Sequence, residues 1–105
     1  MALVFTDANF ESEVKMANQL TFVDFWAPWC GPCQQTGPYV DEIASELAGR
    51  VKVGKVNVDE NPNVAGEYNV MSIPTFLVFK DGSVVDEIVG GVQKEKMLEV
   101  IKKHM

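Results

Sequence analysis

The chain has 105 residues, of which 47% are apolar and 23% charged, a balance typical of one globular domain and not of a disordered or collagen-like chain. Fifteen acidic and nine basic side chains give a net charge of −6. This charge excludes the basic footprint of a nucleic-acid-binding protein and gives no attraction to anionic membranes. We therefore expect one soluble, monomeric domain over residues 1–105, with neither a nucleic-acid nor a membrane partner.

The sequence also carries no targeting or membrane-spanning pattern. The first residues lack a basic region followed by a long apolar run, so they do not resemble a signal peptide. The longest uncharged stretch, residues 25–40, contains three prolines and is not a membrane helix. These features predict a cytoplasmic location, where paired cysteines usually serve metal or redox chemistry.

The first half of the chain alternates strand and helix patterns. A short strand at residues 3–5 precedes a helix that Asp7 or Asn9 could cap. Residues 20–26 are β-branched and aromatic and are apolar on both faces, which is typical of a central strand covered on both sides. The apolar positions of the first helix are Phe10, Val14 and Ala17.

A long helix is predicted from Cys30 to Leu47, kinked by Pro38 and ended by Gly49. A second strong strand follows at residues 51–58, and Asn61-Pro62 is predicted to cap a short helix that ends near residue 69. The inward positions of the long helix are predicted to be Cys33, Val40, Ile43, Ala44 and Leu47.

The second half changes character. Strands at residues 75–79 and 84–89, joined by a glycine-containing loop at 80–83, predict an antiparallel hairpin. A final amphipathic helix near residues 94–104 carries Met97, Leu98 and Ile101 on one face. Together the elements predict an α/β fold with a central mixed five-stranded sheet, flanked by four α-helices, whose first half is parallel by right-handed crossover.

Cys30-Gly31-Pro32-Cys33 lies between the buried strand and the start of the long helix. A thiol at a helix N-terminus faces unsatisfied N–H groups and the positive end of the helix dipole, and both favour the thiolate. Cys30 is therefore predicted to be a nucleophile, while Cys33, one turn later on the inner face, is placed to attack a mixed disulfide on Cys30.

Two alternatives fit this pair less well. A structural zinc site needs four ligands, and the chain offers two cysteines and one histidine. A purely structural disulfide across so small a loop would remove little chain entropy. We therefore expect neither a metal nor any other bound cofactor.

The segment from Trp26 to Cys33, WAPWCGPC, resembles the active-site signature of the thioredoxin family. The resemblance covers nearly the whole chain in order and spacing, through Asp24, Pro38, residues 59–62, Ile73-Pro74-Thr75, Lys80-Asp81-Gly82 and Gly90. It implies the thioredoxin fold and a thiol-disulfide oxidoreductase that reduces protein disulfides with a redox-active Cys30–Cys33 pair. It also implies electrons from NADPH through a thioredoxin reductase as partner.

The resemblance assigns roles to residues around the pair. The carboxylate matching Asp24 is buried beneath the second cysteine and accepts its proton, and the lysine matching Lys55 lies near that carboxylate. A buried carboxylate has a raised pKa, as suits a base. The alternatives are that Asp24 is merely solvated and that Lys55 is a surface lysine.

The resemblance also implies a cis bond before Pro74, with the Ile73 backbone pairing with an extended substrate. Trp29 is predicted to be exposed for docking, although it could instead be a core tryptophan. Three charge-free segments should meet at one end of the sheet as an uncharged patch, unless they are simply core elements. The predicted patch residues are Trp29, Gly31, Pro32, Ile73, Pro74, Val89, Gly90 and Gly91.

The sequence departs from the family pattern at Gln34, where lysine or arginine is common, and at Thr36-Gly37 before Pro38. These residues predict a looser helix beneath the site and leave the acidity of the thiol and the range of partners open. Two other functions remain as alternatives. One is a disulfide oxidase or isomerase, for which a histidine at position 32 would be usual, and the other is a non-catalytic binding subunit that uses the same fold.

Overall fold

The structure is a computed structural model that describes all residues, 1–105. It contains five strands, three α-helices and one π-helical segment, so one of the four predicted α-helices is a π-helix instead. The strands are β1 (Leu3–Val4), β2 (Leu20–Trp26), β3 (Val51–Asn57), β4 (Thr75–Lys80) and β5 (Ser83–Val89). The helices are η1 (Glu11–Lys15, the π-helix), α1 (Gly31–Glu46), α2 (Pro62–Glu67) and α3 (Lys94–Lys102).

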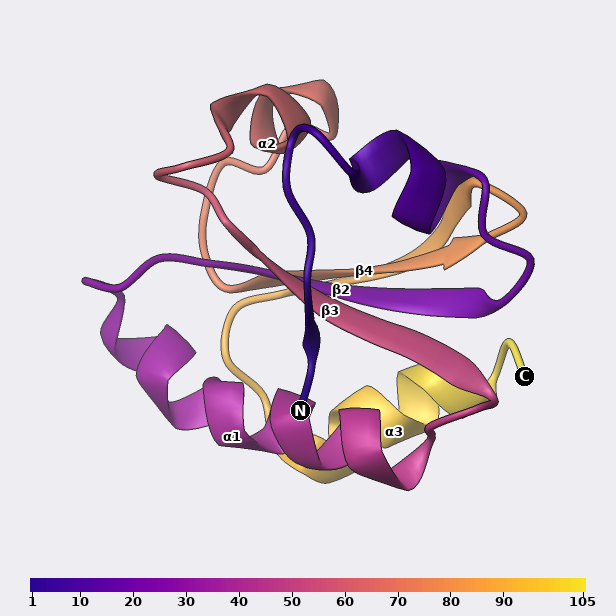
Figure 1. The fold of residues 1–105 in the computed structure, drawn as a ribbon. Coiled ribbons are helices and arrows are strands. Elements are labelled where there is room, and N and C mark those ends of the chain that lie inside the picture. Colours follow the sequence, from indigo (N-terminus) through magenta and orange to yellow (C-terminus); the bar gives the residue numbers. More distant parts are fainter.

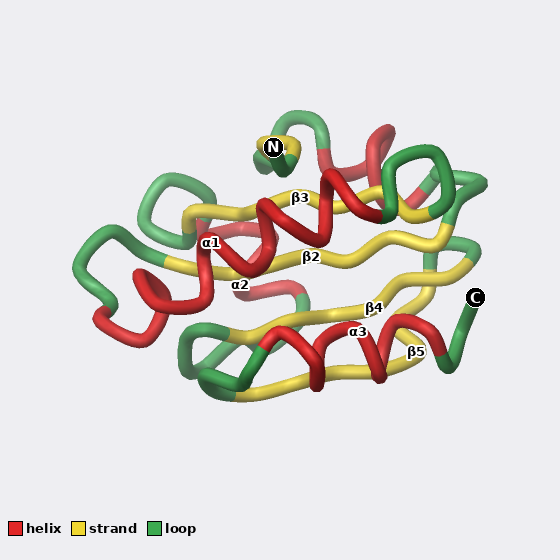
Figure 2. Tube along the Cα trace, turned by 90° about the horizontal axis from the view of Figure 1, so that it is seen from below, coloured by secondary structure: helices red, strands yellow, loops and turns green.

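The five strands form one mixed sheet in the order β1-β3-β2-β4-β5, which confirms the predicted fold. β3 pairs in parallel with β1 and β2, whereas β4 runs antiparallel to both β2 and β5. Helices α1 and α3 cover one face of the sheet, while η1 and α2 lie on the other (Figures 1 and 2). None of the helices is long and apolar enough to cross a membrane.

β2 is the central strand, and its alternating side chains enter two separate cores. Phe22 packs with apolar residues of α1 and α3 on one face. Val23 and Phe25 pack on the other face with residues of η1, α2 and the loop after β1. Asp24 is on the same face as Phe22, so the sheet carries a carboxylate directly beneath α1.

Neither predicted side-chain cap forms, although Asn61 and Pro62 occupy their predicted positions at the start of α2. Phe10, without any side-chain cap, precedes η1, and Asn9 instead exchanges hydrogen bonds with Thr6. The Asp7 carboxylate accepts hydrogen bonds from the backbone of α2, at 2.9 Å from Val64 N. Asn61 makes no side-chain cap of its own helix. A long-range contact from Asp7 therefore replaces the local cap of α2, whereas the Thr6–Asn9 pair before η1 is local.

The hairpin is tighter than predicted. Each strand extends by one residue at the turn, and only Asp81 and Gly82 remain in the turn, both at positive φ. This is the backbone of a two-residue turn that matches the twist of the strands. The long helix begins one residue later and ends one residue earlier than predicted. Within it Thr36 is buried, whereas Ala44 is only half-buried.

Candidate active site

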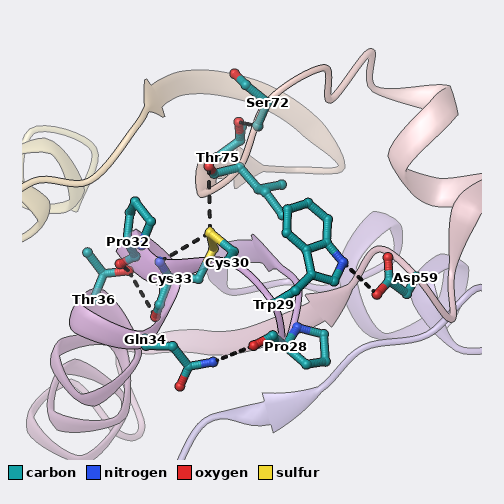
Figure 3. The surroundings of a disulfide bond; sticks show 11 residues. Pro28, Trp29, Cys30, Pro32, Cys33, Gln34, Thr36, Asp59, Ser72 and Thr75 are labelled. Carbon is teal, nitrogen blue, oxygen red and sulfur yellow. Dashed lines mark hydrogen bonds between the residues drawn. A yellow bond between two sulfur atoms is a disulfide. The ribbon is translucent and has the colours of Figure 1, made fainter.

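Cys30 is the residue before the first turn of α1, in extended conformation, and forms a disulfide with Cys33. The Cα atoms of the two cysteines are 5.2 Å apart. The backbone N–H of Cys33 donates to the Cys30 sulfur at 3.3 Å, so this sulfur occupies the position of a helix-capping acceptor (Figure 3). A negative charge that develops on the Cys30 sulfur would meet an N–H donor and the positive helix end.

Both cysteines are nearly buried, at 5% exposure for Cys30 and 4% for Cys33. Their surroundings distinguish them. The Cys30 sulfur lies 3.8 Å from the carbonyl oxygen of Ile73, beside the loop that leads into β4. Cys33 lines a cavity beneath α1 together with Asp24. Cys30 is therefore next to the loop before β4, whereas Cys33 shares a cavity with the buried carboxyl group.

Asp24 is 1% exposed, and its Oδ1 atom has no hydrogen-bond partner. Burial raises the pKa of this carboxyl to about 7, an effect that the charge of Lys55 partly offsets and that of Asp41 reinforces. A carboxyl with a pKa near neutrality can exchange a proton at physiological pH. The alternative of a solvated Asp24 is wrong.

Lys55 is the register partner of Asp24 on β3, and it is neither a free surface lysine nor a direct ion partner of Asp24. Its ammonium lies 3.3 Å from Asp41 Oδ2, with the Gly37 carbonyl oxygen also at 3.3 Å. The positive charge acts on Asp24 through space from this position.

The cavity has a volume of about 290 Å³ and connects the second cysteine to polar groups of three elements. Two departures from the family pattern lie on its wall, Gln34 and Gly37. The Gln34 side chain donates to the Pro28 carbonyl oxygen at 2.9 Å and joins α1 to the preceding loop (Figure 3). The complete lining is Asp24, Trp26, Cys33, Gln34, Gly37, Pro38, Asp41 and Lys55.

Trp29 is 70% exposed beside the disulfide, so it is not a core tryptophan. Its indole N–H donates to Asp59 Oδ2 at 2.9 Å, which fixes the ring against the loop after β3 (Figure 3). Trp29 and Ile73 share a mostly apolar groove of about 350 Å³. The other residues that line it are Val58, Val70, Met71 and Ser72.

The three charge-free segments meet around the disulfide. Gly91 lies against Pro32 and Thr36, while the Gly90 N–H donates to the Pro74 carbonyl oxygen at 2.8 Å. The Ile73–Pro74 bond is cis, as the resemblance implies. Gly31, Pro32, Val89 and Gly91 are exposed, Ile73 and Gly90 are half-buried, and Pro74 is buried.

Sequence reasoning missed three polar residues of the site. Asp59 carries no pattern that connects it with Trp29, whereas Thr36 is four residues after Pro32 on the predicted helix, a spacing that could have indicated their contact. The Thr36 hydroxyl donates back to the Pro32 carbonyl oxygen at 3.2 Å inside the first turns of α1. Asp41 could have been found, because residues 33, 37 and 41 are spaced by four and share one helix face.

The comparisons with known proteins agree with this geometry. A family model described as Thioredoxin matches residues 1–103. The chain is 50% identical over 105 residues to Thioredoxin 1 of Synechococcus elongatus, covering 100% of this chain and 98% of the relative. It is 51% identical over 106 residues to a thioredoxin of Staphylococcus aureus, with both chains covered completely. Thioredoxin 2 of Chlorobaculum tepidum is 45% identical over 100 residues, which are 95% of this chain and 92% of that one. With its disulfide at the start of α1, the chain belongs to the thioredoxin family of thiol-disulfide oxidoreductases.

Proposed function

We propose that, in the reduction of protein disulfides that this chain performs through Cys30 and Cys33, Cys30 is the nucleophile and Cys33 the resolving thiol. The Cys30 thiolate attacks one sulfur of the substrate disulfide, forms a mixed disulfide and releases the first substrate thiolate. Asp24 accepts the proton of Cys33, whose thiolate then attacks Cys30. The Cys30–Cys33 bond forms as the bond to the substrate breaks, and the second substrate thiolate leaves.

The observation that carries these roles is the different surroundings of the two sulfurs. Cys30 receives the N–H of Cys33 at the start of α1, which stabilises a thiolate. Cys33 shares its cavity with a buried carboxyl whose pKa lies near 7. General-base help to Cys33 is therefore available where the second attack begins.

Replacement of each cysteine by serine tests the order of attack. Cys33→Ser should still react with a protein disulfide but stop at the mixed disulfide, whereas Cys30→Ser should be inert. Alkylation of the reduced wild-type protein by iodoacetamide near pH 7 should modify Cys30 first. Faster modification of Cys33 would reverse the assignment.

For substrate binding we propose the uncharged patch around the disulfide. Neither the N–H nor the carbonyl of Ile73 takes part in a backbone–backbone hydrogen bond, and the carbonyl oxygen contacts only the Cys30 sulfur, at 3.8 Å. Both groups can therefore pair with the backbone of an extended substrate segment. The surroundings of that segment are Trp29, Gly31, Pro32, Val89, Gly90 and Gly91, whereas Pro74 is buried beneath them. A charge introduced by Val89→Asp should raise KM for oxidised insulin several-fold; an unchanged KM would remove Val89 from the patch.

The oxidised disulfide must receive electrons from another protein. We assign reduction of the Cys30–Cys33 disulfide to a thioredoxin reductase using NADPH, because a catalyst left oxidised must be reduced before each turnover. The rate of NADPH oxidation in a mixture of this protein, such a reductase and insulin measures the electron transfer, and no oxidation would contradict the assignment.

A reductant of protein disulfides suits the cytoplasm, where thiols are kept reduced, and cell fractionation tests that location. We also propose that residues 1–105 form a single monomeric domain. Such a domain should sediment as one species in analytical ultracentrifugation and unfold in one transition in urea.

A further inference from the structure

Asp41 is a second carboxylate at the cavity that contains Asp24 and Cys33, and the catalytic roles above do not use it. It lies on α1, two turns after Cys33 on the same helix face. Its Oδ2 atom is 3.3 Å from the Lys55 ammonium. Its Oδ1 atom accepts a hydrogen bond from the N–H of Ala2, at 3.1 Å, the residue before the edge strand β1 that pairs in parallel with β3 (Figure 2).

These contacts make Asp41 a fixed anion. Partial burial opposes its ionisation, but the Ala2 hydrogen bond and the contact with Lys55 hold the pKa of Asp41 below its ordinary value. The ammonium of Lys55 is thus held between Asp41 and the Gly37 carbonyl oxygen, at 3.3 Å from each.

The consequence concerns Asp24. Lys55 and Asp24 are register partners on adjacent strands, yet the ion pair forms with Asp41. Asp24 is left with one oxygen that has no hydrogen-bond partner. An ammonium paired directly with Asp24 would favour the carboxylate and make it a weaker base for Cys33.

We propose that Asp41 is a positioning residue for disulfide exchange, which holds the Lys55 ammonium away from Asp24 and so keeps Asp24 able to take the Cys33 proton. The proposal rests on the proposed role of Asp24. The charged or titratable groups facing Asp24 are Cys33 and Asp41 from α1 and Lys55 from β3, while its β4 register partner is the apolar Phe76. The charge of the N-terminal amino group also lowers the pKa of Asp41.

The test uses Asp41→Asn, which keeps the shape and the acceptor for Ala2 but removes the charge. The carboxyl titration of Asp24 is followed by NMR in the oxidised protein, where Cys33 does not titrate. We expect the midpoint to fall by about 0.5 to 1 pH unit, because Lys55 then loses its ion pair with Asp41 and is free to move toward Asp24. The rising limb of the pH profile for mixed-disulfide resolution should move down by the same amount. An unmoved Asp24 midpoint would overturn the proposal.

Three further variants separate positioning from charge alone. Glu42→Gln removes an equal charge from the next position of α1, where the partner is Lys94, and should leave the Asp24 midpoint in place. Asp41→Glu should restore most of the wild-type midpoint, and it covers the case in which Asp41→Asn fails to fold. In a Lys55→Met background the Asp41→Asn shift should fall to less than half. An equal shift with and without Lys55 would show that Asp41 acts by its own charge and would overturn the positioning role.

The titration needs no activity, so its outcome is independent of the assigned cysteine roles. If the Asp24 midpoint falls as expected but the rate of mixed-disulfide resolution stays unchanged at every pH, the proposed role of Asp24 fails. If the Asp24 midpoint does not move in Asp41→Asn, while replacement of Asp24 itself slows resolution of the mixed disulfide, only the inference about Asp41 fails.

Discussion

At the scale of single residues, the site depends on one carboxylate placed where apolar residues would be more stable. Asp24 is buried beneath α1, in a strand whose Phe22, Val23 and Phe25 side chains enter the two cores. Its burial raises its pKa to about 7, and the neighbouring Lys55 does not pair with it directly. The buried carboxylate lowers the free energy of unfolding at the same pH at which it can accept a proton. One substitution of Asp24 can therefore measure both the stability cost and the contribution to the reaction rate.

Asp24→Asn should stabilise the fold at pH 8 and remove a pH dependence. The folded state holds the Asp24 proton up to about pH 7, while the unfolded chain loses it near pH 4, so stability falls as pH rises through this window. The pKa rise from 3.8 to about 7 corresponds to at most about 4 kcal/mol. Urea unfolding should therefore show a gain of about 1–4 kcal/mol for the variant at pH 8 and a smaller difference at pH 5.

The same substitution deletes the proposed proton acceptor. Resolution of the mixed disulfide should slow by about 10-fold to 100-fold, the low end of general-base effects, because water can substitute. A variant less stable than the wild type at pH 8 would mean that the carboxylate form is paired. An unchanged rate would remove the catalytic role even if the stability result held.

At the scale of elements, the hairpin of β4 and β5 is fixed against η1 by a close backbone approach. A Cβ atom on Gly82 would lie 2.5 Å from the Lys15 carbonyl oxygen, and the residue has φ +81°. Gly49, which follows α1, has a similar φ of +85° but open space around its Cα. The two glycines therefore separate the cost of the backbone conformation from the cost of a collision.

Gly82→Ala should destabilise the protein more than Gly49→Ala. Positive φ costs a residue with a Cβ atom about 1–2 kcal/mol, which applies to both positions. Only at Gly82 must the turn also move away from η1, so we expect a further loss of about 1–3 kcal/mol. Thermal or urea unfolding of both variants measures the difference. Equal losses would show that the contact between the hairpin and η1 opens without cost.

The sequence predicted elements well where one side-chain pattern decides the structure. Residues 20–26 are apolar on both faces, and the structure places them as β2, the central strand, with the same bounds. It failed at the start of α2, where the distant Asp7 carboxylate accepts hydrogen bonds from the backbone N–H groups in place of the local Asn61 side chain. Local propensity contains no information about such contacts.

The site shows the same division. The sequence alone locates both cysteines at the start of the long helix, because the WCGPC motif is contiguous in the chain with the strand before it and the helix after it. The ion pair of Lys55 with Asp41 depends on the packing of α1 over β3 and on the path of residues 1–2, so the sequence alone could not select it over a pair with Asp24. Pro74 was predicted within the exposed patch, but it is buried under the segment that Gly90 begins.

At the scale of the whole molecule, two cores on opposite faces of the sheet hold the fold, and the disulfide lies outside both. One core joins α1 and α3 to the sheet, and the other joins η1 and α2 to it. The cysteines form a small separate cluster with Ala27. The catalyst must pass between dithiol and disulfide in every turnover, and this separation lets the fold persist in both states.

Reduction should therefore weaken the protein without unfolding it. Closing a loop between residues three apart removes chain entropy equivalent to about 2 kcal/mol from the unfolded state, so the oxidised form should be more stable by about that amount. Urea unfolding with and without excess dithiothreitol should give two single transitions, with the reduced protein at the lower midpoint and with a similar slope. Near-ultraviolet circular dichroism without urea should show ordered aromatic side chains in both forms. Loss of that signal on reduction would mean that the disulfide, rather than the two cores, maintains the packing around the sheet.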